Sequence, residues 1–445
     1  MTIGAGVSRW TMLHLSSAVV AFIVAQVLLT WSYADPIEGL SAPETLICVH
    51  IITVGWLSLL MLGALYQFIP VITNSMLFSQ HLPIFGYGAI LVGLFGMVAG
   101  FSAFGGNDFL SLTCLPVGGG LVLIGLITGA LNIGLTLWRA RPIPMQAFFV
   151  AVGLGFLLLT GIAGLTFTLA LTLKTPPPFL TQFLQHGLIA HVAAGLVGWF
   201  TLTAMGVSYR LLSMFMLAPE DANRTTYAAL ILTPIGLLVV IAAATFLGDK
   251  VLGNKLGTIG AGIAALGLAF YLIDIAHLYR VRKRRHLELN SLAAVAALAC
   301  LALAILATTV AVVTGTQGKF AGALAYLFIF GWLSGLGLSQ LYKIVPFMTW
   351  LEVFGKRLGN GPVPRVQDLV FELRARGWFV LYFGSVVAAT LSIATAAKMT
   401  FAIASYVELV ATVLIGLELW QSRHPDPEMI SRPLGAARSV PTAKS

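Results

Sequence analysis

Histidine and cysteine side chains that could bind a metal gather at the start of two long apolar segments. Cys48 and His50 begin the second such segment of the chain, and His186 and His191 begin the sixth. Imidazole is the commonest ligand of haem iron and copper, whereas thiolate suits copper(I) or zinc. The alternative is structural: a neutral histidine bonded between helices, and a cysteine packed as a small apolar residue.

Helix geometry restricts which of these side chains could share one metal. If the two segments cross a membrane in the same direction, His50 and His191 differ in depth by only about 3 Å. Facing helices could then hold one haem iron from both sides. His186 and His191 point about 140° apart on a straight helix, so they are not expected to bind one ion together. We therefore expect His50 and His191 as ligands, with His186 and Cys48 as further candidates.

The elements that carry these side chains are expected to span a membrane. The chain has 445 residues, of which 58% are hydrophobic and 9% charged, with a mean hydropathy of +0.95. A soluble domain has about 25% charged residues. The composition therefore excludes a cytosolic enzyme, and three cysteines exclude a disulfide scaffold. We ascribe the net charge of +9 to cationic membrane loops and expect no nucleic-acid partner.

Apolar runs of about 20 residues predict an all-α integral membrane protein with twelve spans. One transmembrane domain covers 1–420, and a disordered cytoplasmic tail covers 421–445. A short interfacial helix is expected within 351–376. Lys and Arg gather in the loops on the side of the N-terminus, which places both termini in the cytoplasm of a bacterial-type inner membrane. The predicted spans are 10–33, 46–70, 84–104, 111–138, 147–173, 183–215, 227–247, 258–280, 291–316, 320–348, 377–397 and 401–420.

A sequence pattern recurs in the second, sixth and tenth spans, each four spans after the last. Each has a Gly-Trp pair, a Tyr ten residues after the Trp, and then a polar or cationic residue. Such repeats place ligand sites at the repeat interfaces in membrane proteins. The alternative is that these residues only pack helices or anchor them at the interface. The three copies are Gly55–Trp56 with Tyr66 and Gln67, Gly198–Trp199 with Tyr209 and Arg210, and Gly331–Trp332 with Tyr342 and Lys343.

Twelve spans in three groups of four, with key residues on spans 2, 6 and 10, resemble subunit I of the haem-copper oxidase superfamily. Within this superfamily, the general character of the sequence is most similar to that of the C-family oxidases, the nitric oxide reductases and the related NnrS-type membrane proteins. The resemblance covers the whole chain in topology, but in motif mainly spans 2 and 6. It implies that His50 matches the outer ligand of a low-spin haem. It also implies that His186 and His191 lie where the family binds copper.

The sequence departs from this family in its ligand set. The family has two adjacent histidines on the seventh span and two on the tenth, whereas the spans 227–247 and 320–348 contain none. Tyr326 stands in the tenth span where the register of the second places His50. An oxygen-reducing centre is therefore incomplete, and it stays open whether the protein is an enzyme.

Four residues of the second, sixth and tenth spans could contact a haem if the resemblance holds. Arg210 and Lys343 could pair with haem propionates, or could instead extend to phospholipid headgroups. Gly63 could allow a flat macrocycle, or equally a neighbouring helix, to approach closely. Tyr326 could replace the missing histidine.

Two acidic positions inside spans also invite explanation, because ionisable groups are costly in a membrane. Glu408 could serve a proton path, or it could be neutral and hydrogen-bonded. Asp274 and His277 share a helix face and could orient a ligand or carry protons. A structural hydrogen-bonded pair is the alternative.

We therefore expect a haem-binding protein, with copper as a second candidate cofactor. The resemblance links it to nitric oxide or another diatomic gas, to respiratory electron transfer, or to complex biogenesis. Its partners would be other respiratory membrane subunits or a cytochrome c. Three alternatives stay open: a catalytic oxidase-like or nitric oxide reductase-like subunit completed by a partner, a haem or metal transporter, and a cofactor-free scaffold.

Overall fold

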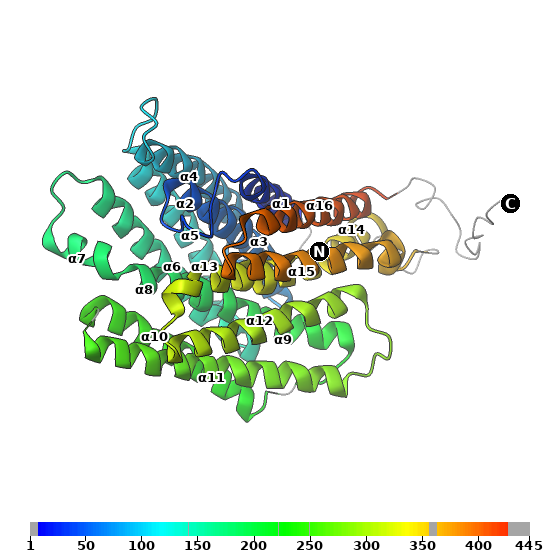
Figure 1. Cartoon of the computed structure of the whole chain (residues 1–445). Helices are drawn as coiled ribbons and strands as arrows, with labels where there is room; N and C mark the ends of the chain where they lie inside the picture. The colour runs from blue at the N-terminus through cyan, green and yellow to red at the C-terminus, as the bar shows by residue number, and fades with distance from the viewer. Residues whose placement is uncertain (1–7, 141, 221, 249, 356–362, 426–445) are drawn as a thin grey trace.

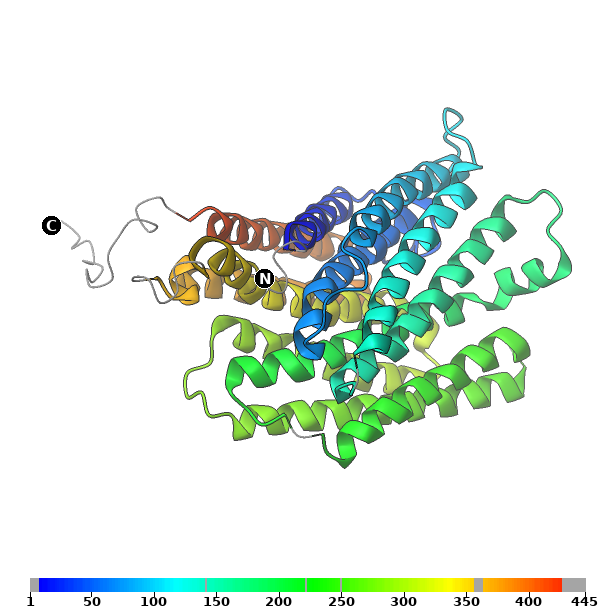
Figure 2. The ribbon, with the colours of Figure 1, turned by 180° about the vertical axis from the view of Figure 1, so that it is seen from behind.

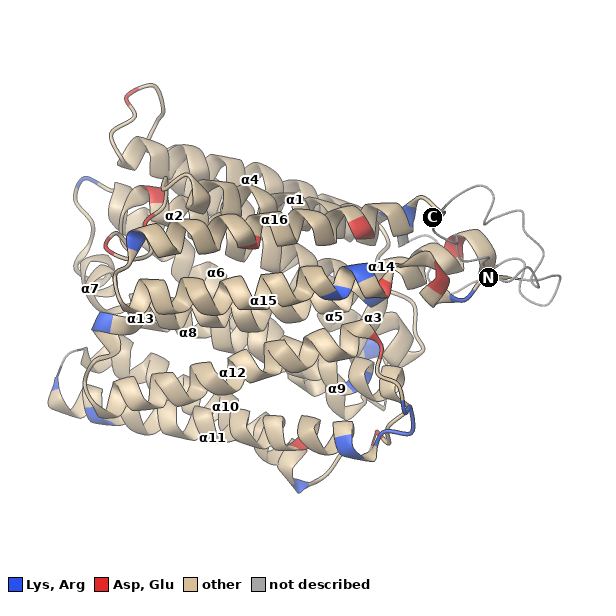
Figure 3. Cartoon of the chain, turned by 45° about the vertical axis from the view of Figure 1, so that its right-hand side comes forward, with Lys and Arg blue, Asp and Glu red and all other residues tan. Residues whose placement is uncertain are grey.

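The computed structural model consists of long helices that run side by side, and it contains no strand in the residues it describes (Figure 1). These residues are 8–140, 142–220, 222–248, 250–355 and 363–425. Within them, twelve helices are long and apolar enough to cross a membrane. The predicted all-α, multi-span class is therefore confirmed. Charged side chains lie mainly at the two ends of the bundle, and its middle is almost free of them (Figure 3).

The helices form three consecutive groups of four spans. The first group comprises α1 (Ser8–Thr30), α2 (Pro43–His50) with η1 (Ile51–Ser58) and α3 (Leu59–Thr73), α4 (Leu82–Phe104) and α5 (Cys114–Arg139). The second comprises α6 (Met145–Thr172), α7 (Pro178–His186), α8 (Leu188–Ala193) with η2 (Ala194–Thr201) and α9 (Leu202–Met216), α10 (Arg224–Ala242) with η3 (Ala243–Leu247), and α11 (Val251–Val281). The third comprises α12 (Leu289–Val313), α13 (Gln317–Tyr326) with η4 (Leu327–Ser334) and α14 (Gly335–Phe354), the short 3₁₀ turn η6 (Val366–Leu369), α15 (Glu372–Ala394) and α16 (Lys398–Arg423).

Helix packing repeats from group to group. The first span of each group packs on the second, and the third packs on the fourth. The groups then join in a closed order: α5 contacts α6, α11 contacts α12, and α16 contacts α1. Figure 2 shows the cyan α5 beside the teal α6, and Figure 1 shows the red α16 beside the dark blue α1. The second spans of the three groups are the most buried helices of the bundle.

Each of these central helices changes to a π-helix over eight residues, and the Gly-Trp pair occupies the same place in all three. The segments read IITVGWLS in η1, AGLVGWFT in η2 and LFIFGWLS in η4. A π-helix is rare and frequently lies at a functional site. The recurring motif of the sequence therefore coincides with a recurring backbone irregularity.

The glycine of each pair brings its helix against the first span of its own group. An added Cβ would lie 3.0 Å from Ala21 at Gly55, 2.5 Å from Phe156 at Gly198 and 2.8 Å from Cys300 at Gly331. The three tryptophans are at most 1% exposed. The repeat tyrosines are buried as well, so they pack between helices rather than anchoring at a lipid interface.

Some local predictions differ from the structure. The predicted span 183–215 is broken at Gly187, so that α7 is a separate helix before α8. The predicted interfacial helix within 351–376 is reduced, in the described residues, to the 3₁₀ turn η6 before α15 begins. Helix α16 extends to Arg423, and residues 426–445 of the predicted tail lie outside the described part.

Candidate functional site

His50 and His191 occupy corresponding places on two of the central helices. His50 is the last residue of α2 before η1, and His191 lies three residues before η2. The two imidazoles are close enough to interact electrostatically. Both are half-buried, and each contacts an aromatic ring: Phe101 lies 5.0 Å from His50, and Phe167 lies 5.8 Å from His191, between ring centroids.

Each of these imidazoles is oriented by a backbone carbonyl. His50 Nδ1 donates to the oxygen of Leu46 at 2.7 Å, and His191 Nδ1 donates to the oxygen of Thr160 in α6 at 3.1 Å. A carbonyl can only accept, so the proton lies on Nδ1 and the Nε2 lone pair is free. Within the described residues neither Nε2 has a hydrogen-bond partner. This is the usual arrangement of a histidine that binds a metal.

The other two candidate ligands, His186 and Cys48, have contacts of their own. His186 ends α7 and packs over Gly248, whose added Cβ would lie 3.0 Å from the ring. Cys48 is buried, and its Sγ donates to the carbonyl of Ala25 at 3.5 Å. The described residues contain no cluster of three or more His, Cys, Asp or Glu side chains that could hold a metal ion.

Tyr326 has the register of His50, as predicted, because it is the last residue before η4. Its hydroxyl donates to Glu408 Oε2 at 2.7 Å, and Gln26 Nε2 donates to Glu408 Oε1 at 3.1 Å. All three side chains are at most 4% exposed. The network links the third group to α1 of the first. Gln26 was not predicted from the sequence, although a single amide side chain within an apolar span is a signal that could have identified it.

The remaining repeat residues have structural partners. Arg210 forms an ion pair with Glu220, and Lys343 Nζ lies 2.5 Å from Glu288. Gly63 faces α1, where an added Cβ would lie 2.7 Å from the Cβ of His14. Of the two interpretations of Gly63, the structure therefore shows the close approach of a neighbouring helix.

The central tryptophans join the three groups through hydrogen bonds. Trp56 Nε1 donates to Ser334 Oγ at 2.9 Å, and Trp332 Nε1 donates to Thr201 Oγ1 at 3.2 Å. Both acceptors are the last residue of a π-segment. By the same pattern Trp199 should donate to Ser58, but its buried Nε1 has no partner among the described residues. The boundary between the helices that carry His50 and His191 thus lacks the bond that closes the other two.

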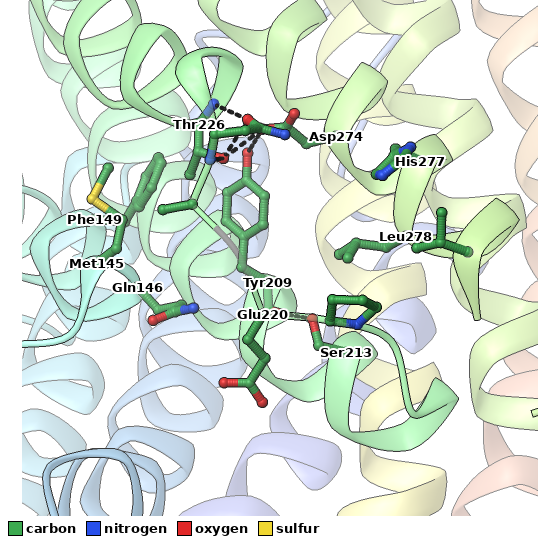
Figure 4. Close-up of a pocket in the computed structure, with 14 residues that line it drawn as sticks. Met145, Gln146, Phe149, Tyr209, Ser213, Glu220, Thr226, Asp274, His277 and Leu278 are labelled. Carbon is green, nitrogen blue, oxygen red and sulfur yellow. Dashed lines mark hydrogen bonds between the residues drawn. The ribbon is translucent and has the colours of Figure 1, made fainter. Parts of the chain in front are cut away.

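A second site lies at the end of the bundle that holds the chain termini. Asp274 in α11 accepts hydrogen bonds from Tyr209 at 2.8 Å, from Thr226 at 3.0 Å and from Thr225. Asp274, Tyr209 and Thr226 line a cavity (Figure 4), and its volume is about 230 Å³. His277 lines the same cavity but forms no hydrogen bond with Asp274, so the predicted Asp-His pair is not made.

No protein-family model matches the chain, and no curated protein is significantly similar to it. The fold itself defines a helical protein of the multi-pass membrane class, with the apolar surface that a lipid bilayer requires.

Proposed function

We propose that the protein binds haem between its second and sixth spans, with His50 and His191 as the iron ligands. The observation that supports this proposal is that the two imidazoles have the same tautomer and the same kind of hydrogen bond. Each donates its Nδ1 proton to a backbone carbonyl, and the Nε2 of each has no hydrogen-bond partner among the described residues. Fixing the tautomer in this way prepares Nε2 for iron and raises its basicity.

The donor set favours haem over a bare metal ion. Zinc and copper sites in proteins take three or four side-chain donors. The described residues supply no such cluster, and Cys48 and His186 are directed to other partners. A porphyrin brings four nitrogens of its own, so that two imidazoles complete the coordination of the iron. Copper remains the second candidate cofactor.

Bound haem would supply a reversible one-electron couple, or an iron that binds a diatomic gas. The chain's own residues would hold the ring in an apolar environment and exclude water from it. Phe101 and Phe167, beside the two imidazoles, fit this role. We therefore propose a part in respiratory electron transfer or in the handling of nitric oxide or another diatomic gas.

The membrane setting is part of the same proposal. The excess of Lys and Arg in loops at the end that holds the termini supports a bacterial-type inner membrane with that end in the cytoplasm. His50 and His191 would then lie toward the outer face. A cytochrome c or another respiratory membrane subunit could reach them there.

The test is the haem content of the full-length protein purified from haem-supplemented cells. We expect about one haem per chain, and its loss in His50→Ala and His191→Ala. The matched control is His14→Ala, because His14 Nδ1 also contacts a backbone carbonyl, that of Trp10, at 2.8 Å but near the opposite end of the bundle. Haem that is retained in both ligand variants would overturn the assignment of the ligands. Substoichiometric, exchangeable haem would favour transport over redox function.

A further inference from the structure

The cavity at the end that holds the termini has features that the haem proposal does not use. It lies between α6, α9, α10 and α11 and has a volume of about 230 Å³, which is enough for a small organic molecule. Its lining combines apolar side chains with a few convergent polar groups, as in most ligand sites. Figure 4 shows the ring of Tyr209 rising along one wall, with Asp274 at its hydroxyl end.

The carboxyl group of Asp274 is buried, and no Lys or Arg of the described residues forms an ion pair with it. It is 4% exposed, and among the described residues its partners are the neutral hydroxyls of Tyr209, Thr225 and Thr226. It forms no ion pair with any of them. Three hydroxyls donate hydrogen bonds to its two oxygens, and it lies at the positive N-terminal end of α10, whose first turn contains Thr225 and Thr226. A buried carboxylate of this kind still favours a cation beside it.

The other charges around the cavity leave this negative charge uncompensated. Glu220 lines the cavity, but its charge is balanced by the ion pair with Arg210. No Lys or Arg is among the described lining residues. His277, which also lines the cavity, is exposed.

Two aromatic rings form the wall beside the carboxylate. The rings of Phe149 and Tyr209 lie 5.4 Å apart between centroids, inclined by 45°. The faces of such rings attract cations, and most strongly where water is excluded. Met145 and Leu278 supply apolar surface around them. A carboxylate beside paired aromatic rings is the chemistry that recognises an organic ammonium ion.

We propose that this cavity binds a small organic ammonium ion from the aqueous phase at the end that holds the termini. The cationic head contacts the rings of Phe149 and Tyr209 and balances the charge of Asp274, while its alkyl groups contact Met145 and Leu278. The site contains neither His50 nor His191, so this proposal can be tested independently of the haem proposal.

The test compares two probes of nearly equal shape on the detergent-purified full chain. Choline carries a quaternary ammonium group, and 3,3-dimethyl-1-butanol is its neutral counterpart. Calorimetric titration is expected to show saturable binding of choline, and binding of the alcohol that is at least about tenfold weaker. Equal affinity for both probes would overturn the proposal, and so would the absence of saturable choline binding.

Variants then test whether choline binds in this cavity. Asp274→Asn keeps an acceptor oxygen for the hydroxyls but removes the charge, and it should weaken choline binding at least about tenfold. Glu288→Gln is the matched control, since Glu288 is a buried acid at the same end but outside this cavity. Unchanged choline affinity in Asp274→Asn would overturn the proposal. If that variant does not fold, Phe149→Leu decides in the same way, because it removes an aromatic face and leaves the carboxylate.

Discussion

Trp56 donates its indole N–H to the hydroxyl of Ser334 across 2.9 Å, although 278 residues separate the two in the chain. The bond joins the π-segment of the second span to the π-segment of the tenth. Trp332 makes the corresponding bond to Thr201, and Trp199 makes none among the described residues. The three copies of one motif therefore differ in a way that stability measurements can detect.

Replacing each of these tryptophans by phenylalanine should lower stability at Trp56 and Trp332, which donate hydrogen bonds, but not at Trp199. Trp56→Phe and Trp332→Phe each remove a buried hydrogen bond, which we expect to lower the free energy of unfolding by about 1–3 kcal/mol. Trp199→Phe removes an N–H that has no partner among the described residues, so the stability of this variant should be unchanged or higher. Unfolding by detergent titration measures all three. Equal destabilisation by Trp199→Phe would show that its indole is bonded after all.

Gly63→Ala should drive α1 away from α3, because the new methyl group would lie 2.7 Å from the Cβ of His14. Overpacking of this kind costs about 1–3 kcal/mol. Gly88→Ala is the control, since nothing lies within 4 Å of an added Cβ there. The free energy of unfolding of Gly88→Ala should rise by up to about 1 kcal/mol, because alanine has the higher helix propensity. Thermal unfolding compares the two, and a stable Gly63→Ala protein would contradict the tight helix contact.

Glu408 and Tyr326 should be energetically coupled, since the tyrosine hydroxyl donates to the carboxylate at 2.7 Å in a buried site. We expect Tyr326→Phe and Glu408→Ala each to destabilise the protein, and the double variant to lose less than the sum. A double-mutant cycle should give a coupling of about 1–3 kcal/mol. Additive losses would show that the two groups do not interact.

The two cations of the repeat should differ in their effect on stability. Lys343→Gln leaves the buried Glu288 without one of its cations, at an expected cost of about 3 kcal/mol. Arg210→Gln breaks a half-exposed ion pair, at a cost of at most about 1 kcal/mol. Neither variant should change the haem content, which is measured on the same samples. Loss of haem in either one would point to propionate binding instead.

The sequence was sufficient to predict the membrane class and the twelve spans, because a span needs only an apolar run of the right length. It also located the motif of the central helices from the spacing of Trp56 and Tyr66 and their two counterparts. The π-segments were not predicted, since the local sequence predicts a continuous apolar α-helix there and the contacts with Ala21, Phe156 and Cys300 come from other helices.

Contacts between residues that are far apart in the sequence could not be predicted either. Asp274 was singled out as an acid within a span, but its bonds go to Tyr209 and Thr226, which are 65 and 48 residues away. Its neighbour His277 had been the expected partner on the basis of helix spacing alone. The break at Gly187 was not predicted either, and His186, the residue before it, packs on Gly248, which is far away in the sequence.

The central claim is that His50 and His191 hold one haem iron, and the reduced-minus-oxidised optical spectrum of the purified full-length protein tests it most directly. The account predicts the sharp bands of a six-coordinate haem with two imidazole ligands. These bands should be lost or shifted in His50→Ala and in His191→Ala, and should be unchanged in His14→Ala. A folded protein that stays colourless after expression with added haem, or bands that are identical in all three variants, would contradict it.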